Sequence, residues 1–319
     1  MDCEVSVILP CYNGAKWISR AIESILSQKY KAFELIIIDD DSIDSSAEIV
    51  SGYLHDQRVR YIHVDHKGFS GALNKGVAES SGEWIGFIGQ DDLWTVNKLA
   101  VQMSYVAQNR NIDLVHSDYY LINGKEEILR IIKGKSFENW PSEKVIQCLF
   151  LNNTLGFETV LVKKKCFDRL GGFDENMAGF SDHDLWLRVA GYYKIGYINI
   201  PLVKKREHER QLSRAKIDSM LKDEFKIIQK GISCYPFLKK VAQRKLAQIS
   251  YEQGIALLNK GKISEGECEL RKTIRVMPWK LKAVAICIAP SLYIYVSTQH
   301  EKIPQLPGPL GWIERELYE

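Results

Sequence analysis

The most informative stretch of the sequence is Gly82-Glu83-Trp84-Ile85-Gly86-Phe87-Ile88-Gly89-Gln90-Asp91-Asp92-Leu93-Trp94, in which an apolar run ends on two adjacent carboxylates. Residues 84–88 have the composition of a buried strand, and ligands in α/β proteins bind at the carboxyl ends of such strands. Carboxylates are also hard oxygen ligands, which suit Mg²⁺ or Mn²⁺ carrying a substrate phosphate. The alternative is that Asp91 caps a helix beginning near Leu93, with Asp92 in its first turn.

Strand-like and helix-like segments alternate before this stretch. Short apolar runs at 5–9, 33–38 and 59–64 alternate with segments of helical spacing at 17–26, 42–53 and 69–80. This alternation predicts a doubly wound, mostly parallel sheet with helices on its faces. Crossover rules then bring Asp39-Asp40-Asp41, which follow the run at 33–38, to the same rim of the sheet as Asp91 and Asp92.

The pattern after residue 94 is mixed. We expect helices at 97–108, 163–170 and 182–192, strands at 114–122, 158–162 and 195–200, and a hairpin turn at Asn123-Gly124. From residue 214 onward only helical signals are present, which predicts an all-helical extension. Within it, residues 251–278 have the spacing of a single tetratricopeptide-type helical hairpin.

Charge is unevenly distributed along the chain. With 45% hydrophobic and 26% charged residues and a net charge of +3, the composition is typical of a soluble globular protein and requires no nucleic-acid partner. From Pro201 to Lys282, however, 20 lysines and arginines face nine acidic residues, so the preceding part is net acidic. A basic extension on an acidic body predicts peripheral contact with an anionic surface such as a membrane; a solvated helical face is the alternative.

The cysteines and the chain start bear on the compartment. The seven cysteines are scattered without a CxxC pair, which favours a reducing compartment over a disulfide framework or a zinc site. The chain starts Met1-Asp2-Cys3-Glu4, which lacks the features of a signal peptide. The apolar segment 283–296 contains Pro290 and is shorter than the roughly 20 residues of a membrane span. We therefore expect a cytoplasmic protein, with any membrane contact at the inner face.

Two further polar clusters carry candidate residues, since the motifs GxGxxG, GxxxxGK[ST] and GxSxG are absent from the sequence. Asp182 stands at the start of an expected helix, where it can act as a general base or as a helix cap. His208 lies in the basic run 204–214, which either binds a metal and a diphosphate or is a solvated linker. For Asp39-Asp40-Asp41, nucleotide or metal binding competes with turn and cap chemistry.

In their order along the chain, these segments resemble family 2 glycosyltransferases over residues 3–214. The motifs that carry the resemblance are Val5–Gly14, Leu35–Asp44, Gly71–Gly76, Ala78–Trp84, Gly171–Glu175 and Asp182–Arg188. The resemblance implies a GT-A fold. The domains it implies are a catalytic domain at 1–214, made of a nucleotide-sugar half (1–94) and an acceptor half (95–214), then a helical extension at 215–301 and an irregular tail at 302–319.

The resemblance also implies roles for individual residues. Those implied to bind the nucleotide are Pro10, Tyr12, Asn13, Asp40, Lys75, Gln90 and Asp91, with Tyr12 and Asp40 at the base, which is usually uracil. Asp91, Asp92 and His208 would hold Mn²⁺ or Mg²⁺, and Asp182 would be the catalytic base. The implied activity is inverting transfer of a sugar from a nucleotide-sugar donor, UDP-linked, to a hydroxyl of a saccharide or lipid-linked acceptor in cell-surface polysaccharide biosynthesis.

The chain departs from the family pattern at several positions. Gly89 stands at the first acidic position of the usual Asp-x-Asp motif, Leu73 replaces an Arg, and Ser181 replaces the Glu that usually precedes the base. Two alternatives stay open. A sugar-nucleotide nucleotidyltransferase would need a glycine-rich basic loop where residues 11–16 lie. A non-catalytic binding or scaffold protein would be consistent with the changed residues.

Overall fold

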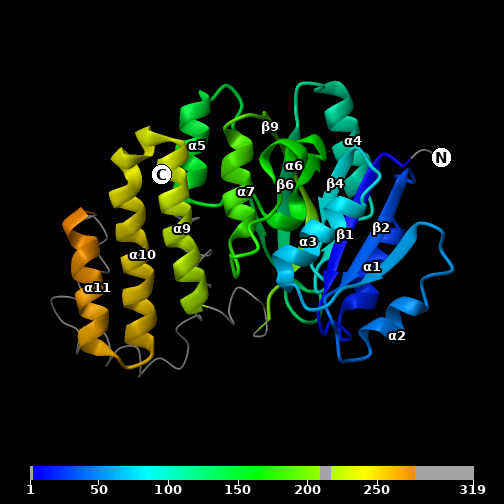
Figure 1. Cartoon of the computed structure of the whole chain (residues 1–319), viewed down its shortest axis with the longest axis horizontal. Helices are drawn as coiled ribbons and strands as arrows, with labels where there is room; N and C mark the ends of the chain where they lie inside the picture. The colour runs from blue at the N-terminus through cyan, green and yellow to red at the C-terminus, as the bar shows by residue number, and fades with distance from the viewer. Residues whose placement is uncertain (1–2, 209–216, 277–319) are drawn as a thin grey trace. The chain divides into compact units, whose positions relative to one another are not determined.

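The computed structural model describes residues 3–208 and 217–276 (Figure 1). Its contacts divide the chain into two compact units. Unit 1 comprises Met1–Leu149 with Asn153–Asp223, and unit 2 comprises Phe150–Asn152 with Glu224–Glu319. All the candidate site residues belong to unit 1.

The first four strands of unit 1 are parallel and lie in the order β3-β2-β1-β4. They are β1 (Val5–Cys11), β2 (Phe33–Asp39), β3 (Val59–His63) and β4 (Trp84–Phe87). Every residue of β1, β2 and β4 is buried, as continuous apolar runs between two layers of helices require. Because Cys11 pairs with Asp39, β1 and β2 end together, and the loops that follow them start side by side.

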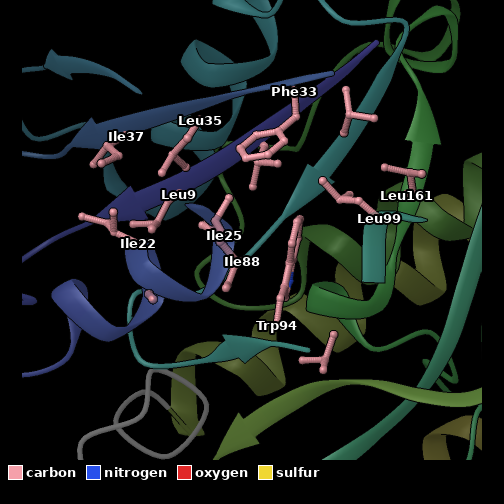
Figure 2. Packing of buried hydrophobic residues seen from close by; sticks show 14 of the residues in the cluster. Leu9, Ile22, Ile25, Phe33, Leu35, Ile37, Ile88, Trp94, Leu99 and Leu161 are labelled. Carbon is pink, nitrogen blue, oxygen red and sulfur yellow. The ribbon is translucent and has the colours of Figure 1, made fainter. Parts of the chain in front are cut away.

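Three helices connect these strands: α1 (Ile18–Leu26), α2 (Ser46–Ser51) and α3 (Gly68–Glu79). The buried residues of α1 recur at the spacing of one helical face, as in Ile18, Ile22 and Ile25. Figure 2 shows Ile22 and Ile25 packed beneath the strands that carry Leu9 and Leu35. A fully buried isoleucine contributes about 1.5–3 kcal/mol relative to an exposed one, so this face fixes α1 on the sheet.

The remaining elements up to residue 208 continue the same sheet in the order β8-β6-β9-β5. They are β5 (Leu93–Trp94), α4 (Lys98–Gln108), β6 (Leu114–Ile122), β7 (Ile128–Ile132), α5 (Ser142–Leu151), η1 (Phe157–Thr159), β8 (Leu161–Lys163), α6 (Lys165–Leu170), α7 (Ser181–Ala190) and β9 (Ile195–Arg206). Strands β5, β7 and β8 are antiparallel to their neighbours, whereas β6 and β9 are parallel to each other. The described residues thus form a nine-stranded, mostly parallel sheet, which confirms the predicted fold class.

Local predictions in this second part are less accurate. No helix begins near Leu93, because Leu93 and Trp94 form β5 and pair with the end of β9. The strand expected at 158–162 is a 3-10 turn followed by the short β8, the strand expected at 195–200 continues to Arg206, and α5 was not predicted. The end of β9 and β5 stabilise each other by pairing across a long sequence separation, which local periodicity cannot show.

The C-terminal part is helical wherever it is described. Its elements are α9 (Ile217–Cys234), η2 (Pro236–Leu238), α10 (Lys239–Asn259) and α11 (Ile263–Val276). Helices α10 and α11 form the helical hairpin predicted from the spacing of residues 251–278, up to Val276. A Cβ on Gly254 would come within 2.7 Å of Leu270 Cγ, so the close packing of the two helices requires glycine at that position.

Several predictions fall outside the described residues. The domain boundary between 214 and 215, the apolar segment 283–296 and the tail 302–319 are in this group. Among the helices of the described ranges, none has both the length and the hydropathy of a membrane span.

Candidate active site

The loop after β1 is held by side chains from two other loops at the same rim of the sheet. Four consecutive backbone N–H groups donate to side-chain oxygens at 2.9–3.0 Å: Tyr12 to Gln90, Asn13 to Ser42, Gly14 to Ser46 and Ala15 to Asp44. In return, Gln90 Nε2 donates to Tyr12 O at 3.1 Å. The loops that follow β1, β2 and β4 are therefore fixed relative to one another, and this set of contacts is called the loop clamp below.

The loop clamp explains two departures from expectation. The helix expected at 42–53 begins only at Ser46, because Ser42 and Asp44 bind the loop after β1 instead of a helix. Burial alone would raise the pKa of Asp44, but hydrogen bonds from Ser46 and from the backbone of Ala15 hold that pKa below its ordinary value. Gln90 occupies the middle of the motif because its amide both accepts from and donates to the backbone of Tyr12, which a carboxylate cannot do.

The three consecutive acids after β2 have three different environments. Asp39 is buried and accepts hydrogen bonds from Tyr61 Oη at 2.6 Å and from Ser42 N. Asp40 is also buried, and its two oxygens accept the N–H groups of Lys67 and Gly68 at 2.6 and 2.9 Å, where α3 begins. A carboxylate at this position is favoured by the helix dipole. Asp41 is exposed and has a left-handed backbone, with φ of 69°.

Tyr12 presents an exposed aromatic face beside Asp40. Its side chain is 48% exposed, and its ring centroid lies 4.8 Å from that of His66. His66 Nδ1 is 3.2 Å from Asp40 Oδ2, so the three side chains form one polar and aromatic corner at the rim. Such a corner offers stacking and hydrogen bonding together, which a nucleobase requires. The base-binding roles of Tyr12 and Asp40 stay predictions.

Asp91 and His208 meet at the carboxyl end of β4. Asp91 Oδ2 and His208 Nε2 are 2.7 Å apart, and both side chains are about a quarter exposed. A carboxylate oxygen and an imidazole nitrogen that converge on one accessible point fit a divalent cation such as Mn²⁺. No group of three or more His, Cys, Asp or Glu converges among the described residues, so a metal here would complete its shell with diphosphate oxygens and water.

Asp92 points away from this pair. It is buried, and its Oδ1 accepts the backbone N–H of Arg206 at 2.7 Å. Burial raises the pKa of Asp92 well above its usual value, and the negative charges of Asp91 and Glu158 add to the shift. Asp92 does not cap a helix, because the strand β5 follows it. Its predicted role as a metal ligand has no supporting geometry, whereas its bond to β9 holds the motif in place.

Arg206 is a site residue whose individual role the sequence did not reveal. Its side chain is fully buried, and its Nε donates to Asp91 O at 2.9 Å. The same guanidinium donates to Asn123 O in the β6–β7 turn and lies 4.1 Å from the ring of Trp17. The basic run 204–214 was interpreted as a diphosphate-binding segment or a charged linker. Arg206 instead holds the backbone of Asp91 in place, and its second hydrogen bond connects the Asp91–His208 pair to the β6–β7 turn.

Asp182 lies in the first turn of α7, as predicted. Its Oδ2 accepts a hydrogen bond from Asn153 Nδ2 at 2.9 Å, and the carboxylate is partly exposed. Burial raises the pKa of Asp182 to about 6, against hydrogen bonds from His183 N and Asn153 that lower it. A carboxylate of this pKa is charged at neutral pH yet basic enough to take a proton from a hydroxyl during reaction. Ser181, in place of the usual Glu, accepts from Ser70 Oγ at 2.8 Å and so joins α7 to α3.

An ion pair between a half-buried lysine and a buried glutamate lies near Asp182 and Asp92. Lys205 Nζ is 3.3 Å from Glu158 Oε1. Burial alone would lower the pKa of Lys205, but the acidic groups of Glu158, Tyr119 and Asp92 together outweigh it and raise that pKa above its ordinary value. Neither residue was named individually as a site residue, because Glu158 fell in an expected strand and Lys205 in the basic run 204–214, whose function was left open.

The motif at 171–175 is held in place by side chains of two helices. Asn74 on α3 forms two hydrogen bonds with the backbone of Phe173, at 2.8 and 2.9 Å. Arg188 on α7 donates to Gly172 O and Leu170 O at 2.8 and 2.7 Å. These two side chains hold the loop between α6 and α7, and α7 in turn carries Asp182.

Two predicted nucleotide-binding residues are less exposed to the rim than the others. Pro10 is buried near the end of β1, opposite Ile38. Lys75 Nζ pairs with Glu79 Oε1 at 2.8 Å, toward the last turn of α3 and away from the N-terminal turn that Asp40 caps. The structure thus does not bring Lys75 to the rim, and its role in nucleotide binding stays a prediction.

Residues 6–160 match the family model described as glycosyl transferase family 2. An uncharacterized glycosyltransferase of Methanocaldococcus jannaschii is 31% identical over 219 residues, which are 66% of this chain and 74% of that protein. The Escherichia coli protein WfgD, a UDP-Glc:alpha-D-GlcNAc-diphosphoundecaprenol beta-1,3-glucosyltransferase, is 29% identical over 251 residues, which are 78% and 91% of the two chains. An uncharacterized glycosyltransferase of Rickettsia felis is 34% identical over 64% of this chain, which spans only 33% of that longer relative.

The fold is similar to those of solved glycosyltransferases. TarS of S. aureus in complex with UDP-GlcNAc superposes with a TM-score of 0.62 at 16% identity, over 85% of this chain and 81% of TarS. The mannosyltransferase PcManGT from Pyrobaculum calidifontis, in complex with GDP-Man and Mn²⁺, gives 0.60 at 18% identity, over 92% and 81%. At these identities the likeness supports the GT-A fold alone. Together with the sequence matches, it shows that this chain belongs to glycosyl transferase family 2, the nucleotide-sugar glycosyltransferases.

Proposed function

We propose that this glycosyltransferase moves a sugar from a UDP-linked donor to a hydroxyl of a saccharide or lipid-linked acceptor, with inversion and with the help of a divalent cation. The observation that carries the proposal is the Asp91–His208 pair, 2.7 Å apart at the rim where the nucleotide is expected. The second support is Asp182, whose raised pKa of about 6 suits a base. A nucleotidyltransferase or a non-catalytic scaffold finds no support in the family match.

Asp91 and His208 would hold the cation. A pair of protein ligands leaves positions for two oxygens of the donor diphosphate, which is how Mg²⁺ and Mn²⁺ are commonly held at phosphate substrates. When bound, the cation offsets the negative charge of the departing nucleoside diphosphate. Arg206 keeps Asp91 in place through its bond to the Asp91 carbonyl.

Asp182 would take the proton from the acceptor hydroxyl as that oxygen attacks the anomeric carbon. Asn153 orients the carboxylate by donating to Oδ2, and the backbone of His183 also donates to this carboxylate. A single displacement by this route inverts the anomeric configuration, because no covalent intermediate forms on the protein. The position of Asp182 on α7, held by the Asn74 and Arg188 scaffold, keeps the base fixed while substrates bind.

The acceptor class follows from a relative. The printed activity of Escherichia coli WfgD uses a diphosphoundecaprenol-linked acceptor, and a lipid-linked acceptor in cell-surface polysaccharide biosynthesis is our proposal for this chain. It includes a cytoplasmic location at the inner face of the membrane. The basic segment 201–282 is proposed as one peripheral contact with that membrane.

A donor panel tests the proposal directly. The purified chain is incubated with UDP-, GDP- and dTDP-linked sugars, with Mn²⁺ or with a chelator, and release of the nucleoside diphosphate is measured. We expect release from a UDP-linked sugar that the chelator abolishes and that a lipid-diphosphate saccharide accelerates. Release that is unaffected by the chelator would contradict the role of Asp91 and His208, and preference for another nucleotide would contradict the UDP assignment.

A further inference from the structure

The strand β7 carries an exposed apolar patch. Ile128, Leu129 and Ile131 are 56%, 52% and 51% exposed, although they stand within a strand of five residues. Single exposed apolar side chains are ordinary, but here Ile128 and Ile131 pair with Ile122 and Tyr120, which lie two residues apart in β6, so these two side chains share one face. A group of exposed apolar side chains usually marks a contact surface. These three residues are called the hairpin patch below.

The hairpin patch lies on an edge strand. In the described part of the chain, β7 pairs with β6 alone, from Tyr119–Ile132 to Ile122–Ile128. The register shifts between Leu121 and Ile122, which leaves Leu129 as the extra residue of a bulge. A bulge twists an edge strand and discourages further strands from adding to it. The patch is therefore better suited to a fluid apolar surface than to another β-strand.

The charges around the hairpin patch indicate which kind of partner it can bind. Lys125 and Lys133 flank it, are exposed, and form no ion pair among the described residues. Two acids are nearby: Glu126, whose carboxylate Arg20 and Arg206 both contact, and the exposed Glu127. With Lys125, Arg130 and Lys133 against these two acids, residues 125–133 keep an excess of one positive charge. An apolar strip between uncompensated lysines is complementary to a bilayer that contains anionic lipids. A second copy paired antiparallel around Leu129 would set Lys125 against Lys133 of the other chain, and like charges at facing positions are unfavourable.

The β6–β7 hairpin is connected to the candidate active site by hydrogen bonds of one residue. Arg206 donates to the carbonyls of Asn123 and Gly124 in the β6–β7 turn at 3.2 and 3.4 Å. The same side chain donates to Asp91 O, next to the proposed cation position. A surface that rests on β7 is thus linked to the site through one buried residue.

We propose that the hairpin patch inserts into the surface of an anionic bilayer, with Lys125 and Lys133 among the lipid headgroups. This contact would hold the site at the membrane surface, where the diphosphate of a lipid-linked acceptor lies. The statement about the acceptor rests on the proposed function, whereas the membrane contact itself does not.

Vesicle flotation tests the contact without donor or acceptor. The full chain is mixed with phosphatidylcholine vesicles, with or without phosphatidylglycerol, and the floating fraction is measured. The test variant is I128T/L129T/I131T, since threonine retains strand propensity. The matched control is L54T/V96T/I200T, whose parent residues are 46%, 43% and 49% exposed elsewhere on unit 1. A third variant, K125Q/K133Q, removes only charge.

We expect the wild type and the control to float with phosphatidylglycerol vesicles, and the patch variant to bind about tenfold more weakly or worse. K125Q/K133Q should lose binding to anionic vesicles by about tenfold and show a smaller salt dependence. Circular dichroism on each variant establishes that it is folded.

Three outcomes would overturn the proposal. The first is no flotation of the wild type, and the second is a patch variant that floats like the wild type, as expected if residues 201–282 or 277–319 make the contact. The third is a dimeric wild type together with a monomeric patch variant, which would show that the hairpin patch binds a second copy of this chain. Because binding is read without chemistry, failure of the UDP-sugar assignment leaves this result interpretable.

Discussion

The two halves of the catalytic part contribute to the candidate site in different ways. In residues 3–94 the loop clamp satisfies four successive N–H groups with side-chain oxygens, so the rim is set before any donor arrives. In residues 95–208, Asp182 and His208 are partly exposed, so both side chains are accessible to substrates. We infer that the first half pre-organises donor binding, that Asp182 in the second half carries the chemistry, and that His208 joins the two halves by sharing the proposed cation with Asp91. Substitutions in the two halves should therefore separate affinity from rate.

The largest effect is expected from Asp182→Asn. The amide retains the shape of the side chain but cannot take a proton, so kcat should fall on the order of 10²- to 10⁴-fold. Calorimetry should show donor binding within about twofold of the wild type. The exposed Asp168→Asn, in the same half of the chain, is the control and should leave both quantities unchanged. An Asp182→Asn protein with full activity would refute the base assignment.

The second-largest effect is expected on donor affinity, and it should distinguish Asp91 from its neighbour Asp92. Asp91→Asn alters one of the two proposed cation ligands, so the Mn²⁺-dependent affinity for the nucleotide-sugar donor should fall by at least about tenfold. Asp92→Asn should retain most of that affinity, because an amide oxygen can still accept the N–H of Arg206. Calorimetry with Mn²⁺ and with a chelator measures both. Equal losses in the two variants would restore Asp92 as a ligand of the same rank as Asp91.

Sequence reasoning succeeded where the signal is local. The apolar runs of β1, β2 and β4 predicted the parallel strands, and the acids after β2 and β4 predicted the rim. Asp91, Asp182 and His208 were named from their places along the chain, and their roles stay predictions. It failed where a residue is defined by a distant partner. Leu93 and Trp94 form a strand only because β9 is available to pair with them. For the same reason the roles of Arg206 and Glu158 emerged only from the fold.

The residues that depart from the family pattern show the same limit. In the sequence, Ser181 and Gln90 stand where the family usually has other residues, although Gln90 was also predicted to bind the nucleotide. In the structure, each has a partner far along the chain, Ser70 for one and the backbone of Tyr12 for the other. Such compensation is invisible to motif comparison because neither partner belongs to the same local segment.

A smaller effect concerns the pH dependence of the base. Asp182 must be deprotonated to act, so kcat/KM should fall as the pH drops through about 6, where burial places its pKa. Asn153 stabilises the charged form by donating to it. Asn153→Ala should therefore raise this pKa further and move the acidic limb of the profile to higher pH. A limb at the same pH in both proteins would show that another group controls it.

The smallest effect is expected in the loop clamp. Gln90→Ala removes one hydrogen bond to Tyr12 N and one from Gln90 Nε2 to Tyr12 O, each worth about 0.5–1.5 kcal/mol. The freed backbone groups are exposed and can bind water, so donor affinity should weaken only about three- to tenfold, with kcat unchanged. Gln90→Glu is the sharper variant, because it keeps an acceptor for Tyr12 N but has no donor for Tyr12 O and adds a charge beside Asp91. If Gln90→Ala instead lowered kcat and left affinity intact, the division between a binding half and a chemical half would be wrong, since a residue of the first half would then be acting on the reaction itself.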